Sequence, residues 1–505
     1  MKIHLLNTVI SWFLKKRIHQ MELFFKYPLD VQSELLLRLL NVAKNTEVGE
    51  KYNFKNIKNF EMYVKSVPLQ RYESIEHLIE RARKGGQNIF WPTKIKWFAK
   101  SSGTTTSKSK FIPVSDEALE NCHYKAVKDM LCLYVTNNED SKMFSGKNLR
   151  LGGSSAVYEN NDTYFGDLSA IIIENLPLWA EYSSAPKSKT ALLGDWEIKM
   201  DKIIAETIDK DITNIAGVPS WMLVLLNKIL EVTGKDNILE VWPNLEVYFH
   251  GGVNFNPYKE QFKKLLPKKD FKYYETYNAS EGFFAIQDRN NSDEMLLMLD
   301  YGIFYEFIPM DKFDDDNSQT IPLSKVVLNK NYALVITTNA GLWRYLIGDT
   351  IKFTCLNPYR IKVTGRTKHF INAFGEELII DNAENALKLA CNKTNSEIIE
   401  YTVAPIFMKN NTNGAHEWLI EFAVKPKNLK LFTEVLDNAL KSINSDYEAK
   451  RYLNITLNMP KVVIAKKDLF YNWLKAKNKL GGQNKIPRLQ NDRKFMDELN
   501  RDFVF

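Results

Sequence analysis

The chain has 505 residues, of which 45% are hydrophobic and 12% aromatic, and its formal net charge is +7. This length exceeds one ordinary hydrophobic core, so two or more domains are expected, and the composition excludes a disordered chain. The mildly basic charge suits small anionic substrates such as nucleotides and carboxylates. Nucleic acid is not expected as a partner, because no DNA- or RNA-binding motif accompanies the charge.

The N-terminal 25 residues begin with an apolar segment, residues 3–14, which is shorter than the ~20 residues that a membrane-spanning helix needs. We expect a packed amphipathic helix and no transmembrane segment; attachment to a membrane surface is the alternative. The cysteines lack metal-ligand spacing, so free thiols in a reducing cytoplasm are expected. They are Cys122, Cys132, Cys355 and Cys391.

The first ninety residues are predicted to be helical, and a mixed region follows. Strands are expected at residues 95–99 and 111–114, on either side of a hydroxyl-rich loop. Ser115 is placed to cap a helix that runs toward Tyr134, because acidic residues at 116 and 117 favour the first turn of a helix. Another helix is predicted around residues 215–230, with the turn Gly217-Val218-Pro219-Ser220 near its start.

Two short predicted strands, residues 245–249 and 273–277, each end at a polar loop that contains glycine. This pattern indicates one rim of an α/β sheet, where ligands usually bind. Residues 295–363 are predicted to be rich in strands. Beyond Arg366 we expect a small α+β unit with strands at 397–403, 418–424 and 461–465 and helices at 429–443 and 468–477.

The loop from Lys100 to Lys110 combines hydroxyl residues, a glycine and three lysines, which is the chemistry that holds a polyphosphate. A hydroxyl-rich surface turn is the alternative. Its expected place between two strands argues against the common P-loop, which joins a strand to a helix. Walker A, GxGxxG, HExxH and GxSxG patterns do not occur in the chain. The predicted phosphate contacts are Ser101, Ser102, Gly103, Thr104, Thr105, Lys108 and Lys110.

Further motifs follow the loop in order. They are Tyr277-Asn278-Ala279-Ser280-Glu281, Trp343-Arg344-Tyr345-Leu346-Ile347-Gly348-Asp349, the segment 365–377, and Gln483-Asn484-Lys485-Ile486-Pro487-Arg488. Together they resemble the adenylate-forming superfamily, which includes acyl-CoA synthetases and luciferases. Within it the chain is most similar to the auxin-responsive acyl acid amido synthetases. That family has an SSGT loop, then YxxSE, LYRYRVGD and QYKxPR, so the resemblance covers nearly the whole chain.

Two positions depart from the family pattern. Leu346 stands where the family usually has the arginine of YRVGD, and Arg344 is kept two positions earlier. Asn484 replaces the tyrosine of QYK. The first departure concerns a nucleotide or phosphate contact, and the second concerns the side of the site that receives the acceptor.

The resemblance implies ATP and Mg²⁺ as cofactors and assigns roles to particular residues. Glu281 would be the magnesium-associated acid and Asp349 would accept hydrogen bonds from the ribose hydroxyls. Tyr277 would stack on adenine beside Gly251 and Gly252. Lys485 would assist adenylation from a mobile C-terminal segment, and Glu281 would share the catalytic role. Further nucleotide contacts are implied at Asn278, Ser280 and Arg366.

Each of these residues also has an ordinary structural interpretation. Glu281 could be an acid at a strand end, Asp349 a turn residue, Tyr277 a core tyrosine and Lys485 a surface lysine. His250, which precedes Gly251, could contact substrate or simply pack at the end of its strand.

The predicted fold is a multi-domain α/β, adenylate-forming fold of the acyl-CoA synthetase and luciferase type. Residues 1–365 would form a large ATP- and acyl-binding domain with a β-rich part, 366–370 a hinge, and 371–505 a mobile α+β domain. The acyl pocket is expected near residues 183–192 and 217–221. The resemblance implies that this chain adenylates a carboxylic acid and transfers the acyl group to an amine, with an amino acid as the expected acceptor and a monomer as the expected state. An acyl-CoA synthetase and a non-catalytic nucleotide-binding protein are the alternatives.

Overall fold

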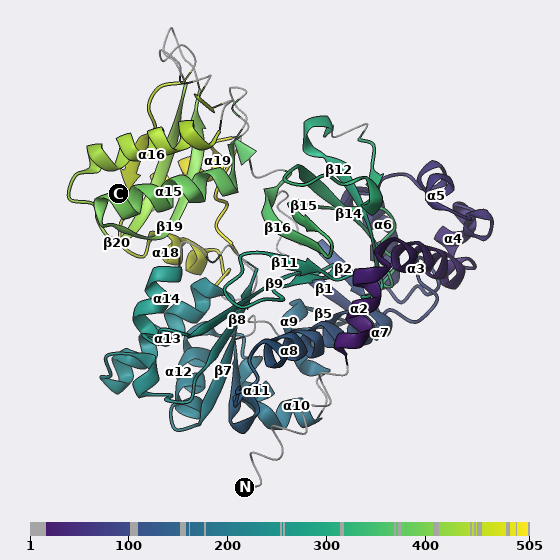
Figure 1. Ribbon diagram of the computed structural model, residues 1–505, viewed down its shortest axis with the longest axis horizontal. Helices are drawn as coiled ribbons and strands as arrows, with labels where there is room; N and C mark the ends of the chain where they lie inside the picture. Colours follow the sequence, from purple (N-terminus) through teal and green to yellow (C-terminus); the bar gives the residue numbers. More distant parts are fainter. Residues whose placement is uncertain are drawn as a thin grey trace.

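The computed structural model describes residues 17–101, 110–151, 158–160, 162–175, 178–252, 255, 258–313, 318–367, 370–371, 376, 378–407, 414–444, 447–448, 451, 457–480, 485–490 and 492–502. Within these ranges the strands form a twelve-stranded sheet and three smaller sheets of four, three and two strands. Figure 1 shows the three-stranded sheet and its helices at one end of the molecule, above the helices α13 (Pro219–Thr233) and α14 (Lys259–Leu265).

The N-terminal region is helical, as the sequence predicts, and it packs on the large sheet. Helix α3 (Pro28–Ala43) carries an apolar stripe that includes Leu36 and Leu40, both almost fully buried. Its Gln32 side chain donates hydrogen bonds to the carbonyls of Leu299 and Ile303 and thereby satisfies a buried amide. The helices are α2 (Ile18–Lys26), α3 (Pro28–Ala43), α4 (Glu47–Lys51), α5 (Phe60–Ser66) and α6 (Tyr72–Arg83).

The hydroxyl-rich loop joins two antiparallel strands, which confirms its predicted setting. Strand β1 (Trp97–Ser101) pairs with β2 (Lys110–Val114) from Trp97 opposite Val114 to Ser101 opposite Lys110. The loop itself, residues 102–109, lies outside the described residues. Strands β5 (Thr163–Gly166) and β4 (Tyr158–Asn160) complete this four-stranded sheet.

The helix after β2 begins where the sequence predicts. The Ser115 hydroxyl accepts a hydrogen bond from the backbone N–H of Ala118 at 3.0 Å and donates one to the Asn339 carbonyl at 2.7 Å. The helix continues to Asn137 through three segments, and the middle one is a π-helical turn. They are α7 (Asp116–Ala118), η2 (Leu119–Tyr124) and α8 (Lys125–Asn137).

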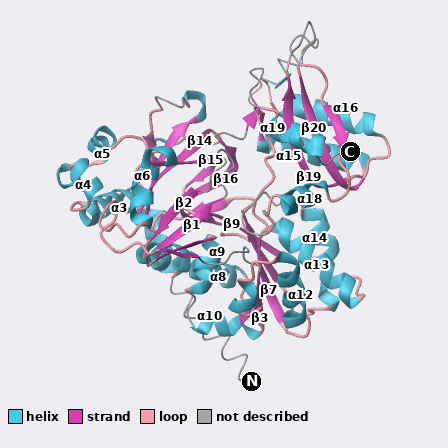
Figure 2. Cartoon of the chain, turned by 180° about the vertical axis from the view of Figure 1, so that it is seen from behind, coloured by secondary structure: helices cyan, strands magenta, loops and turns pink. Residues whose placement is uncertain are grey.

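One half of the large sheet is parallel and has helices on both faces (Figure 2). Alternate residues of a strand point to opposite faces, so Phe249 packs with α8 while Tyr248 packs with α13. The strands, in sheet order, are β6 (Ser184–Ala185), β3 (Lys147–Arg150), β7 (Ile212–Gly217), β8 (Val247–Gly251) and β9 (Lys272–Ala279). The covering helices include α9 (Leu168–Glu174), α10 (Leu178–Ser183), α11 (Ser188–Ala191) and α12 (Trp196–Thr207).

The parallel strands β7, β8 and β9 end at one edge, which confirms the predicted rim. Gly217 lies opposite His250, and Gly251 lies opposite Thr276. The helix expected over 215–230 starts later than predicted, at Pro219, because residues 212–217 belong to β7. The proline at the first helical turn fixes that start.

The other half of the large sheet is antiparallel, as expected for the β-rich region. A tight turn at Ser280 and Glu281 connects β9 to β10, and Asp349 lies opposite Arg366 in the hairpin formed by the last two strands of this half. The strands are β10 (Gly282–Ile286), β11 (Met295–Leu297), β12 (Ile303–Pro309), β13 (Ile321–Pro322), β14 (Asn331–Thr338), β15 (Tyr345–Leu356) and β16 (Tyr359–Arg366).

The C-terminal unit contains the predicted strands and helices together with two helices, α15 and α19, that the sequence did not indicate. Its core includes Tyr401, Trp418 and Leu436. A second apolar cluster joins Leu469, Phe470 and Trp473 of this unit to residues of α13 and α14. The elements are β17 (Phe370–Ile371), β18 (Leu378–Ile379), α15 (Ile380–Thr394), β19 (Glu397–Ile406), β20 (Ala415–Val424), α16 (Leu429–Ile443), β21 (Lys461–Ile464), α18 (Leu469–Ala476) and α19 (Lys494–Asp502).

Among the described residues, no helix is long and apolar enough to cross a membrane. The apolar N-terminal segment 3–14 lies outside those residues. The four cysteines are free thiols, and two of them, Cys122 and Cys132, are buried.

Candidate active site

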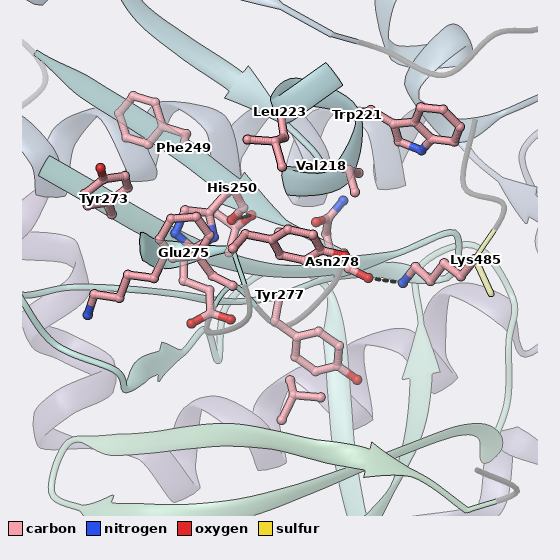
Figure 3. A pocket seen from close by; sticks show the side chains of 18 of the residues that line it. Val218, Trp221, Leu223, Phe249, His250, Tyr273, Glu275, Tyr277, Asn278 and Lys485 are labelled. Atoms are coloured by element: carbon pink, nitrogen blue, oxygen red, sulfur yellow. Dashed lines mark hydrogen bonds between the residues drawn. The ribbon is translucent and has the colours of Figure 1, made fainter. Parts of the chain in front are cut away.

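A pocket of about 1680 Å³ opens at the edge where β7, β8 and β9 end, and it extends beneath the C-terminal unit. Its walls include Gly251, Gly252, Asn278, Ser280, Glu281, Asp349, Arg366 and Lys485, so residues from four separate sequence motifs meet there. Figure 3 shows Tyr277 and Asn278 beside Lys485, which enters from the C-terminal segment.

Three of the predicted residues form one hydrogen-bonded group. The Tyr277 hydroxyl donates to Asp349 Oδ2 at 2.8 Å, and Arg366 Nε lies 2.8 Å from Asp349 Oδ1. Asp349 and Arg366 meet because they are register partners on β15 and β16. The Asp349 carboxylate raises the pKa of Arg366, while burial and then Asp349 hold the pKa of Tyr277 well above its usual value. The side chain of Tyr277 is therefore neither a plain core tyrosine nor ionised.

Glu281 is a perturbed carboxylate in the turn between β9 and β10. Burial raises its pKa to about 7, and the negative charge of Asp349 adds to the shift. The positive charges of Arg366 and Lys110 oppose it. Lys110, at the start of β2, also lies over the Tyr72 ring at 5.4 Å. A carboxyl group with this pKa, inside a pocket, is typical of a functional residue rather than of an ordinary acid at a strand end.

The two glycines at the end of β8 bring the backbone close to the pocket. A Cβ at Gly251 would lie 2.5 Å from the Thr276 carbonyl oxygen, so a side chain cannot be accommodated there without a shift. Gly252 has a φ of +80°, which favours glycine. Neighbouring Asn278 and buried Ser280 also line the pocket. Glycine is therefore required at 251 by the close approach of β9 and favoured at 252 by the backbone conformation.

Lys485 reaches from the C-terminal unit to the N-terminal part of the chain, where its ammonium group donates to the Gly252 carbonyl. Burial lowers its pKa to about 8, and the Arg366 charge lowers it further, whereas Asp349 acts in the opposite direction. The side chain still has exposed surface toward the pocket. Its position inside the pocket argues against an ordinary surface lysine.

Arg488, three residues further on, anchors this segment and was not predicted as a site residue. Its guanidinium lies 2.5 Å from Glu384 and 3.1 Å from Glu400 within the C-terminal unit. It also donates to the Tyr258 hydroxyl of the N-terminal part at 3.0 Å. Its place in the QNKIPR motif was the only signal in the sequence, because the partners are distant along the chain.

Arg344 does not reach the pocket. Its guanidinium is buried against Glu306, at 2.9 Å, and donates to the Val67 carbonyl at 2.6 Å. Leu346 is buried in a small apolar cluster with Ile308 and Val335, away from the residues that line the pocket. The departure at Leu346 therefore leaves the described walls of the pocket unchanged.

His250 packs and lines the pocket at the same time. Its ring stacks on Phe255 at a centroid distance of 4.1 Å, and it is nearly fully buried. Burial lowers its pKa to about 3, so the ring is neutral. Both interpretations raised by the sequence are compatible with this position.

Several predicted residues fall outside the described part of the chain. They are Ser102, Gly103, Thr104, Thr105 and Lys108 of the loop, Asn484, and residues 368–369 of the expected hinge. Ser101 is described as the last residue of β1, without its side chain.

Part of the pocket wall is mostly apolar and comes from the helices α8, α9 and α13, the π-helical turn before α8, and the ends of β7 and β8; we call this part of the wall the apolar arm. Of the two segments expected here, Gly217 to Trp221 contributes, but residues 183–192 do not, because they form β6 and α11 at the far edge of the sheet. That part of the prediction is wrong. The arm is lined by His123, Val127, Met130, Leu151, Ser169, Ile172, Ala216, Val218, Trp221, Val224, Phe249 and Phe283.

Comparison with solved structures identifies the class of fold. An acyl acid amido synthetase in complex with 2,4-DB, named AtGH3.15, superimposes with a TM-score of 0.78 at 15% identity, covering 94% of each chain. A 2-hydroxyisobutyryl-CoA ligase in the postadenylation state gives a TM-score of 0.58 at 13% identity, covering 94% of this chain and 91% of the ligase. The fold is therefore that of the adenylate-forming enzymes.

The family follows from the sequence models. The N-terminal, central and C-terminal domains of the GH3 family match residues 17–271, 296–366 and 381–494. The chain belongs to the GH3 family. It is also 22% identical to the indole-3-acetic acid-amido synthetase GH3.3 of Arabidopsis thaliana, over 94% of this chain and 91% of that protein. The family and the fold class predicted from the motifs are confirmed.

Proposed function

We propose that this chain is an ATP-dependent acyl acid amido synthetase, which adenylates a carboxylic acid and transfers the acyl group to an amine, with an amino acid as the acceptor. The observation that carries the proposal is the meeting of Tyr277, Asp349 and Arg366 with Lys485 in one pocket. Family membership and the amido synthetase relatives support it.

In our assignment the nucleoside of ATP lies at the end of β8 and β9. Tyr277 and the backbone of Gly251 and Gly252 bracket the adenine, and Asn278 and Ser280 lie beside it. Asp349 accepts from the ribose hydroxyls; each carboxylate oxygen has two lone pairs, so the bonds from Tyr277 and Arg366 leave acceptor capacity. Lys110, together with the loop from Ser101 to Lys108, holds the β- and γ-phosphates.

The residues at Glu281 fit Mg²⁺. A carboxylate is the kind of oxygen ligand that this ion takes, and a divalent cation would favour the charged form of a group whose pKa burial raises to about 7. Glu281 would hold the ion, and Mg²⁺ would supply positive charge that offsets the charge on the phosphate oxygens. Among the described residues, no cluster of three or more metal-binding side chains occurs.

The reaction has two steps. First, a carboxylate oxygen of the acid attacks the α-phosphorus, a new P–O bond forms, and pyrophosphate leaves with the electrons of the broken bond. Arg366 and Lys485 hold the two anions together and stabilise the developing charge. Second, the amine nitrogen attacks the acyl carbon, AMP leaves with the electrons of the C–O bond, and the amine loses a proton.

We propose that residues 366–370 are a hinge between residues 1–365 and 371–505, and that the C-terminal unit rotates between the two steps. Contacts between the two parts support a docked arrangement that delivers Lys485. Gln261 donates to the Ile398 carbonyl at 3.2 Å, Lys264 pairs with Glu397, and Arg488 donates to Tyr258.

The free thiols favour a cytoplasmic location, where ATP is also supplied. We propose that the chain acts as a monomer.

Pyrophosphate exchange with labelled ATP, screened over a library of carboxylic acids, tests the first step. Product masses with pooled amino acids or with coenzyme A then separate amide synthesis from thioester synthesis. If no acid in the library stimulates exchange, a non-catalytic nucleotide-binding protein is favoured.

Two variants test the roles of the residues. Glu281→Gln and Lys485→Ala should each lower exchange by about a hundredfold, the loss typical of a group that stabilises transition-state charge. Glu231→Gln and Lys466→Ala, at exposed positions of α13 and the C-terminal unit, are matched controls that should stay active. Near-normal exchange in both site variants would contradict the assignment.

A further inference from the structure

His123 is a polar side chain in the apolar arm of the pocket. It lines the arm with Val127 and Met130, at spacings of four and seven residues, so these three residues share one face of the helix that runs from 116 to 137. The arm also contains Ile172 of α9 and Phe249 of β8. Only 3% of the surface of His123 is exposed. An imidazole is therefore placed among aliphatic and aromatic groups.

His123 lies in a stretch of irregular helix whose neighbouring residues contact other elements. The backbone N–H of Phe283 donates to the Cys122 sulfur at 3.2 Å, and the Tyr124 hydroxyl donates to the Asn175 carbonyl at 2.8 Å. The neighbours on both sides of His123 are thus held by other elements.

The imidazole of His123 makes no hydrogen bond to any residue of the described chain. Burial lowers its pKa to about 4, and no charged neighbour contributes to that shift, so the ring is neutral at physiological pH. A neutral imidazole has one donor and one acceptor. Because the described chain uses neither group, both can serve a ligand that binds at the part of the pocket wall where His123 lies.

We propose that His123 determines the acyl specificity of this enzyme, and that the activated acid carries an uncharged hydroxyl or carbonyl group on a cyclic, apolar body. The inference rests on the proposed function, since it takes the arm as the acyl site. The rings of Trp221, Phe249 and Phe283 line the arm and suit a flat ring. A second carboxylate is disfavoured, because none of the side chains that line this arm is cationic.

Matched acids test the proposal. Binding of 3-phenylpropanoate, its 2-, 3- and 4-hydroxy derivatives and its 4-carboxy derivative is measured by calorimetry, which does not require turnover. Wild-type protein should bind at least one hydroxy acid roughly ten- to a hundredfold more tightly than the parent, since a site built for a hydrogen bond rejects the analogue that lacks it. The same ratio should appear in kcat/KM for pyrophosphate exchange.

Variants separate recognition from packing. His123→Leu should abolish the preference for the hydroxy acid while retaining the parent acid, and His123→Gln should restore part of it. Lys128→Ala, at an exposed position of the same helix outside the pocket wall, is the control and should leave the preference unchanged. Circular dichroism and thermal unfolding verify that each variant is folded.

The outcomes distinguish this inference from the proposed function. A preference that survives in His123→Leu, equal affinities for all uncharged acids, or a preference for the dicarboxylic acid would overturn the role of His123. Selective binding without acid-dependent exchange would support that role and contradict the proposed activity. If none of the acids binds, the assignment of the arm as an acyl site is wrong, and the inference falls with it.

Discussion

The contrast between Arg344 and Arg366 gives a sharp test of the site, because both arginines belong to motifs shared with the family. Arg344 is 4% exposed and donates to Glu306, Val67 and Thr320, the last at 2.8 Å. Arg344→Met would leave the fully buried Glu306 carboxylate without its cation. Breaking a buried pair by removing one partner costs about 3–5 kcal/mol. We expect a loss of stability of this size.

The same change should leave the KM for ATP almost unchanged, because the guanidinium lies outside the pocket. Arg366→Met is the matched control. Its side chain is 40% exposed, so the loss of stability should be about 1 kcal/mol or less, while ATP binding should weaken clearly.

The assay combines urea unfolding with pyrophosphate exchange below the transition. Glu306→Gln and the double variant of Arg344 and Glu306 complete a double-mutant cycle. The coupling free energy between these two residues should be about 1–3 kcal/mol. A stable Arg344→Met protein with weak ATP binding would refute the structural role of Arg344.

Three further predictions concern the site itself. Glu281→Gln should raise the Mg²⁺ concentration for half-maximal exchange by at least about tenfold, whereas Glu231→Gln should not; an unchanged requirement would contradict a metal-binding role. Lys485 has a pKa lowered to about 8, so it loses its charge as the pH rises through that value, and kcat/KM for ATP should fall above pH 8. In Lys485→Arg, kcat/KM for ATP should no longer fall above pH 8. A fall that persists in this variant would show that another group causes it. A cross-link between cysteines at positions 264 and 397, in a background with Cys355 and Cys391 replaced by serine, should preserve exchange and abolish amide formation; if both survive, the hinge proposal is wrong.

The rim of the pocket could be predicted from the sequence because its signals are local. A short apolar strand followed by glycines predicts the end of β8, and Tyr277 to Glu281 predicts the end of β9. Parallel strands bring their carboxyl ends to one edge, so both loops had to meet. The cap at Ser115 was equally local, since its partner is three residues away.

The partners of the buried arginines could not be predicted, because they are distant along the chain. Glu306 lies 38 residues before Arg344, and Tyr258 lies 230 residues before Arg488. The same limit applies to the pairing of β11 with β16, which continues the large sheet between strands far apart in sequence. No periodicity of the chain indicates such contacts.

The role of His123 was missed for a different reason. A histidine in an amphipathic helix is usually a packed or solvated residue, and its sequence neighbours Cys122 and Tyr124 give no functional signal. Only the tertiary structure shows that His123 lines a pocket together with residues of other elements such as α9. Acyl specificity therefore depends on tertiary geometry, whereas the nucleotide site depends on motifs.

The docked position of the C-terminal unit determines whether Lys485 reaches the residues assigned to ATP. Leu469, Phe470 and Trp473 pack into the apolar cluster of α13 and α14, so any rotation about residues 366–370 must expose part of this surface or replace it. The docked arrangement also brings Lys485 to Gly252, beside the residues assigned to ATP. A ligand that attracts Lys485 would therefore stabilise docking, and departure of pyrophosphate would remove part of that attraction. Release of the first product would in this way favour the rotation that the second step requires.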